Sequence, residues 1–150
     1  QQECIAILLL GSDLGLCGRF NDQIVDYALE RVAGQQDDRK SFRWLTVGAR
    51  ATARLEARGT EPAATYPLPG SINGLSETVG TILEAVDRWR DEGVINRAVI
   101  FYNHREELGA SAPRMRRLWP SDPRYFHALA HRPWASRTLP MFTMHIWLSV

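Results

Sequence analysis

Residues 4–21 read CIAILLLGSDLGLCGRFN, and the order of apolar, glycine-rich and amphipathic parts in this stretch decides the fold class. Residues 5–10 are all apolar, which is typical of a strand covered on both faces in a parallel sheet. Glycines at positions 11, 15 and 18 allow a sharp turn, and apolar residues then recur at helical spacing along residues 24–32. The stretch therefore predicts a buried strand, a tight loop and a helix, as in an α/β fold.

The alternation of strand and helix continues along the chain. Glycines are expected to end the helices, at Gly34, Gly59 and Gly93. The further predicted strands are residues 42–47, 60–66, 98–102 and 114–118, and the further predicted helices are residues 49–58 and a long helix capped by Ser71, Asn73 or Ser76. Residues 1–120 are thus expected to form a Rossmann-like three-layer sandwich, a doubly wound α/β fold with about five mostly parallel strands.

The composition is that of one soluble domain. A chain of 150 residues that is 45% hydrophobic and 23% charged can bury a single core, and its net charge of +1 gives no general attraction to nucleic acid or acidic lipid. No apolar run approaches the roughly 18 residues of a membrane span, so no direct lipid insertion is expected. Cys4 and Cys17 lie at opposite ends of the first strand and turn, and we expect both to be reduced thiols.

The glycine-rich loop from Gly11 to Gly18 raises the question of phosphate binding. A dinucleotide loop has the spacing G-x-G-x-x-G and an acidic residue after the next strand, whereas here the glycines follow a different spacing and Gly48-Ala49-Arg50 follows that strand. The pattern favours a structural turn. A small Rossmann-like enzyme domain that binds a nucleotide or phosphate with the loop of residues 11–18 stays open as the alternative function.

Candidate catalytic and metal-binding residues are few. Asp13 occupies the place where α/β enzymes put catalytic acids, but its side chain can equally cap the turn that follows, and the sequence favours this structural role. The histidines have no cysteine or carboxylate at ligand spacing; they are His104, His127, His131 and His145. We therefore expect no catalytic centre, no metal and no cofactor.

The same glycine-rich stretch carries a family resemblance. GSDLGLCGRFN resembles the SDRGLCGG(L/Y)N signature of the gamma subunit of F-type ATP synthases, with Leu14 and Arg19 as departures. The matching residues are Ser12, Asp13, Gly15, Leu16, Cys17, Gly18 and Asn21. Residues 44–59, WLTVGARATARLEARG, and residues 97–108, RAVIFYNHREEL, are similar to two further segments of that family in the same order.

The resemblance implies a mechanical role rather than an enzymatic one. It implies the central domain of a rotor, or central stalk, subunit that couples ion-driven rotation of the membrane ring to ATP synthesis or hydrolysis. The implied partners are the epsilon subunit, the c subunits of the ring and, through a terminal coiled coil that residues 1–150 lack, the alpha/beta catalytic hexamer. The implied location is peripheral, on the cytoplasmic face of the bacterial inner membrane.

The end of the chain has a different character. Residues 121–140 are expected to be an irregular loop rich in proline, aromatic residues and arginine, and residues 141–150 the start of a truncated C-terminal helix. Residues 114–137 hold six arginines against the single Asp122, which indicates either a solvated basic edge or a docking surface for an acidic partner. Single-stranded nucleic acid would be bound by the same arginine and aromatic side chains, but nothing else in the sequence supports that partner. The resemblance implies that Arg124, Tyr125 and Phe126 lie near the ring and epsilon, as a candidate subunit interface.

Overall fold

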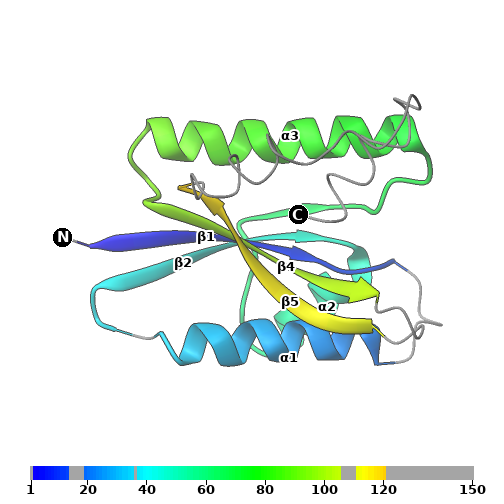
Figure 1. The fold of residues 1–150 in the computed structure, drawn as a ribbon, viewed down its shortest axis with the longest axis horizontal. Coiled ribbons are helices and arrows are strands. Elements are labelled where there is room, and N and C mark those ends of the chain that lie inside the picture. Colours follow the sequence, from blue (N-terminus) through cyan, green and yellow to red (C-terminus); the bar gives the residue numbers. More distant parts are fainter. Residues whose placement is uncertain (1, 14–18, 36, 106–110, 121–150) are drawn as a thin grey trace, which may run out of the picture. The chain divides into compact units, whose positions relative to one another are not determined.

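The computed structural model of the protein describes residues 2–13, 19–35, 37–105 and 111–120 (Figure 1). These residues alternate strands and helices as the sequence predicts. The elements are β1 (Glu3–Leu10), α1 (Phe20–Ala33), β2 (Lys40–Val47), α2 (Ala49–Ala57), β3 (Ala64–Tyr66), α3 (Ile72–Asp91), β4 (Arg97–Arg105) and β5 (Ser111–Trp119). The predicted segments 121–140 and 141–150 lie outside the described residues.

The strands form one sheet in the order β3-β2-β1-β4-β5. β1 pairs in parallel with β2 and with β4, and β2 pairs in parallel with β3. The chain winds outward from β1 to β3 and then returns through α3 to place β4 on the other side of β1. This order is that of half a Rossmann fold, and it puts the point where the winding reverses between β1 and β4.

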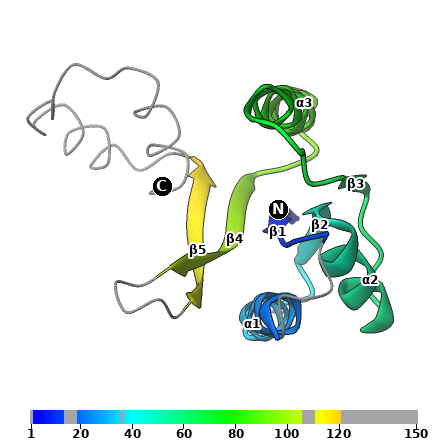
Figure 2. The ribbon, with the colours of Figure 1, turned by 90° about the vertical axis from the view of Figure 1, so that its right-hand side faces the viewer.

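The helices cover both faces of the sheet. α1 and α2 lie on one face and α3 on the other, and this arrangement of three layers is clearest in Figure 2. β1 contributes side chains to the core on both faces of the sheet. Ile5, Ile7 and Leu9 pack with α1 and α2, while Ala6 and Leu8 pack with α3. The unbroken apolar run is thus explained, and the predicted α/β class with a mostly parallel sheet is confirmed.

Two strands differ from the sequence-based prediction. The strand expected at residues 60–66 is only Ala64–Tyr66, because Thr60 still closes the end of α2 by donating its N–H to the Leu55 carbonyl at 3.2 Å. The last strand is longer than residues 114–118 and runs antiparallel to β4. An antiparallel neighbour needs only a hairpin connection, whereas a parallel one would need a crossover of a dozen or more residues.

The helix ends test the caps and terminal glycines that the sequence predicted. Ser71 is the cap of α3, since its Oγ accepts a hydrogen bond from the Gly74 N–H at 3.1 Å. Gly59 and Gly93 have the positive φ values that favour glycine, 82° and 69°. Gly34 follows α1 as predicted, but its φ of −68° is open to any residue, so the conformational freedom of glycine is not needed there.

Candidate functional site

The family-signature residues lie at the carboxyl ends of the parallel strands. Ser12 and Asp13 follow β1 after the single residue Gly11, and Asn21 is in the first turn of α1. In doubly wound folds this edge of the sheet, next to the point of reversal, is where ligands bind. Gly15, Leu16, Cys17 and Gly18 lie outside the described residues.

Ser12 and Asn21 form a reciprocal pair. The Ser12 N–H donates to Asn21 Oδ1 at 2.9 Å, and Asn21 Nδ2 donates to Ser12 Oγ at 3.0 Å. Both residues are buried, with exposed fractions of 8% and 6%. A side-chain amide accepts through its oxygen and donates through its nitrogen, so asparagine at position 21 fits the pair as an ionised aspartate would not. The pair joins the beginning of the signature loop to the start of α1.

Asp13 joins three loops through its carboxylate. Oδ1 accepts the N–H of Ala49, the first residue of α2, at 2.5 Å, and Oδ2 accepts the N–H of Leu68, between β3 and α3, at 2.9 Å. A carboxylate at a helix N-terminus is favoured by the unpaired N–H groups and by the helix dipole. The sequence predicted that Asp13 would cap the turn that follows it. In the structure its carboxylate accepts a hydrogen bond from a helix 36 residues away in sequence. The turn that follows Asp13, residues 14–18, lies outside the described residues.

Two glycines allow the loops to approach each other closely. Gly48, before α2, has a φ of 100°, and a Cβ there would lie 2.8 Å from the Ser12 nitrogen. At Gly11 a Cβ would lie 2.1 Å from Cβ of Ala51 in α2. The close contacts of both glycines are therefore with the protein itself.

Backbone hydrogen bonds complete these contacts. The Gly11 N–H donates to the Val47 carbonyl at 2.8 Å, the Gly48 N–H to the Tyr66 carbonyl at 2.9 Å, and the Arg50 N–H to the Ser12 carbonyl at 3.1 Å. The loops after β1, β2 and β3 are thus tied to one another by main-chain groups as well as by Asp13.

The site contains residues that the sequence reasoning did not single out. Asn103 of β4 donates from Nδ2 to the Phe20 carbonyl at 3.2 Å and so ties the end of β4 to the start of α1. Buried Thr46 shares a 2.7 Å hydrogen bond between hydroxyls with Thr52, and the Thr52 hydroxyl donates to the Gly48 carbonyl at 3.0 Å. Asn103 could have been singled out from the sequence, because residues 97–108 are similar to a segment of the gamma subunit family. The threonines gave no signal, because their pairing depends on how α2 packs.

This geometry bears on anion binding. A phosphate at a helix N-terminus needs N–H groups that point into open space. At α2 those of Ala49 and Arg50 are taken by Asp13 and by the Ser12 carbonyl. Asp13 therefore occupies the place at α2 that an anion would take. The start of α1 is the other candidate anion site. Its geometry depends on residues 14–18, which lie outside the described residues.

Metal and membrane sites were also sought among the described residues. In that part of the chain no group of three or more histidine, cysteine, aspartate or glutamate side chains could hold a metal ion. None of the helices described there is long and apolar enough to cross a membrane. The candidate interface residues Arg124, Tyr125 and Phe126 lie outside the described residues.

The fold and the internal hydrogen bonds define a Rossmann-like α/β domain whose signature residues hold the strand ends together. A family model described as ATP synthase matches residues 1–141, and the chain belongs to this family. Curated relatives that it matches include ATP synthase gamma chains, which confirms the predicted family. Among them are the ATP synthase gamma chain of Synechococcus sp. (strain JA-3-3Ab), 27% identical over 121 residues, and that of Synechococcus elongatus, 29% identical over 126 residues.

The matches cover most of this chain and a smaller part of the relatives. The two alignments span 81% and 79% of this chain but 38% and 37% of the two gamma chains. The rotor of the Euglena gracilis mitochondrial ATP synthase has a similar fold, with a TM-score of 0.62 at 18% identity over 97% of this chain and 52% of that one. The central stalk and c-ring structure from Tetrahymena thermophila gives 0.59 at 17% identity, over 92% of this chain and 58% of that one.

Proposed function

We propose that this chain provides the central domain of an ATP synthase gamma subunit, a non-catalytic part of the central stalk. In this role the domain turns with the membrane ring and transmits ion-driven rotation to the subunits that make or hydrolyse ATP. The proposal rests on membership of the family and on the likeness to gamma chains. It explains why the signature residues serve to hold loops together.

The observation that carries the proposal is the internal use of Ser12, Asp13 and Asn21. A domain that transmits torque must resist shear between its elements, and cross-links between loops supply that resistance. Asp13 connects the loops after β1, β2 and β3, and the Ser12–Asn21 pair connects β1 to α1. A nucleotide-binding domain would instead leave main-chain N–H groups at these strand ends for its ligand.

The partners follow from the family and are proposals for this chain. We propose that the domain docks the epsilon subunit and the polar loops of the c-ring, and that the complete subunit reaches the alpha/beta hexamer through a coiled coil. The domain would then sit peripherally on the cytoplasmic face of the bacterial inner membrane. Arg124, Tyr125 and Phe126 are the proposed contact residues, because arginine and aromatic side chains are enriched at interfaces.

A calorimetric titration of this chain with the epsilon subunit of its own organism tests the proposal. We expect saturable binding of epsilon and no heat from ATP, NAD or inorganic phosphate. The triple variant Arg124→Glu, Tyr125→Ala, Phe126→Ala should weaken epsilon binding, whereas Arg88→Glu, a change of an exposed arginine on α3, should not. A nucleotide signal without epsilon binding would refute the rotor function and favour a ligand site in the loop of residues 11–18.

A further inference from the structure

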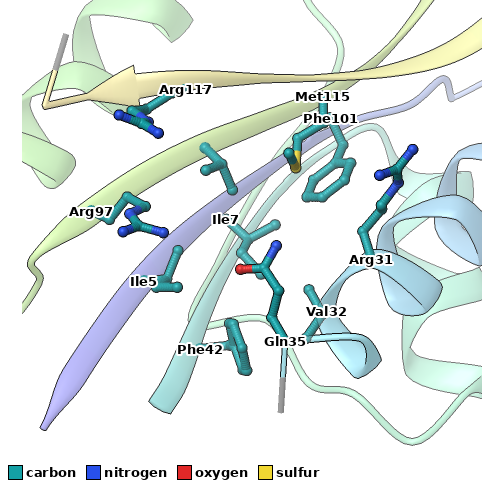
Figure 3. Close-up of a pocket in the computed structure, with 11 residues that line it drawn as sticks. Ile5, Ile7, Arg31, Val32, Gln35, Phe42, Arg97, Phe101, Met115 and Arg117 are labelled. Atoms are coloured by element: carbon teal, nitrogen blue, oxygen red, sulfur yellow. The ribbon is translucent and has the colours of Figure 1, made fainter. Parts of the chain in front are cut away.

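A pocket of about 230 Å³ is lined by residues of β1, α1, β2, β4 and β5 and one residue that follows α1. Figure 2 shows that β4 and β5 extend beyond α1. The floor of the pocket is apolar and includes Phe42, Val99 and Met115. Its rim carries three arginines, with Arg97 and Arg117 on one side and Arg31 on the other (Figure 3). We call this feature the arginine pocket.

The charged side chains that line the arginine pocket are all arginines. β4 and β5 read RAVIFYNHR and SAPRMRRLW, and neither strand contains an acidic residue. Arg97 pairs with Glu3 at 3.1 Å, and Arg31 lies over the ring of Tyr27 at 5.0 Å. Within the described part of the chain, neither Arg31 nor Arg117 forms an ion pair. The acidic residues 106 and 107 follow β4 in the sequence but lie outside the described residues.

The pocket exposes apolar surface beside this charge. Met115 is 37% exposed, and Val99 and Phe42 are half-buried. Arginine, methionine and aromatic residues are the types enriched at protein interfaces. In addition, β5 is the edge strand of the described sheet, and its outer main-chain groups can pair with an added strand.

We propose that the arginine pocket and the edge of β5 dock an acidic segment of a protein partner. Apolar side chains of the segment enter the pocket, and its carboxylates pair with Arg31 and Arg117, since guanidinium groups bind carboxylates through two parallel hydrogen bonds. Residues 121–150 of this chain are a poor match for the pocket, because they contain three arginines and the single acid Asp122. The proposal is drawn from the described residues alone and does not depend on the rotor function.

The test uses the full 150-residue chain and a defined probe, the capped hexapeptide Glu-Glu-Leu-Phe-Glu-Glu. The amide resonances of Phe42, Val99 and Met115 and the methyl resonances of Val99 and Met115 should shift on titration. The affinity should fall as salt is added. Arg117→Glu should weaken binding about tenfold, because one attraction is lost and one repulsion is gained. Arg50→Glu, the same charge change at an exposed position of α2, should leave binding unchanged.

Several results would overturn the proposal. The first is the absence of peptide binding, and the second is an equal affinity for the control peptide Glu-Glu-Ser-Ser-Glu-Glu. The third is that Arg50→Glu weakens binding as much as Arg117→Glu does. The fourth is that phosphatidylserine vesicles displace the peptide at a concentration below that of the peptide. The first three would mean no site or only general charge attraction, and the last would favour a membrane surface. If Arg117→Glu does not fold, the milder Arg117→Gln should still weaken binding about threefold, and unchanged affinity would refute the role of this arginine.

Discussion

Removal of the Asp13 carboxylate is the sharpest test of the signature network. In Asp13→Ala the N–H groups of Ala49 and Leu68 lose acceptors that lie at 2.5 and 2.9 Å. Loss of a capping aspartate alone costs about 0.5–2 kcal/mol, and a net hydrogen bond to a charged group is worth about 1.5–3 kcal/mol. Because Asp13 is only half-buried, water can replace part of both bonds. We therefore expect a loss of about 2–3 kcal/mol in the free energy of unfolding.

Urea unfolding followed by tryptophan fluorescence measures this loss, since Trp44 and Trp89 are buried in the two core clusters. The melting temperature should fall by about 4–12 °C, at roughly 2–4 °C per kcal/mol for a chain of this size. Hydrogen exchange should also accelerate at the amides of Ala49 and Leu68. Asp13→Asn, which keeps one carbonyl acceptor, should lose about half as much.

The matched control is Asp38→Ala, which removes the same charge from an exposed turn. It should change stability by less than about 0.5 kcal/mol. The reasoning fails if Asp13→Ala is as stable as Asp38→Ala. It also fails if the exchange of Ala49 and Leu68 is unchanged, because the stability loss would then come from somewhere other than these two hydrogen bonds.

Three further predictions use the same unfolding assay. Gly48→Ala should lower the free energy of unfolding by about 3 kcal/mol or more, because its Cβ would meet the Ser12 backbone. Gly59→Ala, also at positive φ but in open space, should lower it by about 1–2 kcal/mol, and equal losses would contradict the close approach at Gly48. Asn21→Asp should cost about 3 kcal/mol, because it removes the donor to Ser12 and buries a charge, and a neutral result would argue against the reciprocal pair. Leu9 is fully buried, and Leu9→Ala should lower the free energy of unfolding by about 2–5 kcal/mol. Leu75 lies on the exposed side of α3, and Leu75→Ala should lower it by less than about 1 kcal/mol. Similar losses for the two variants would contradict the core assignment.

Most of the fold could be predicted from the amino-acid sequence, because burial of a strand and the end of a helix are indicated by neighbouring residues in the chain. The apolar run in β1 matched burial on both faces, and the glycines after α2 and α3 adopt the positive φ that their positions predicted. The sequence of the fifth strand, SAPRMRRLW, did not indicate its direction, however. The sequence therefore predicted a fifth strand without its antiparallel pairing. It also predicted β3 as residues 60–66, of which only Ala64–Tyr66 form the strand.

The candidate site divides in the same way. The sequence alone identified Ser12, Asp13 and Asn21, because they match a family signature directly after a buried strand. Their contacts became clear from the tertiary structure, since the two N–H groups that donate to Asp13 lie 36 and 55 residues further along the chain. The parallel order of the strands brings the loops after β1, β2 and β3 to the same edge of the sheet. Contacts between such distant segments depend on the packing of the whole sheet, which no local pattern of residues encodes.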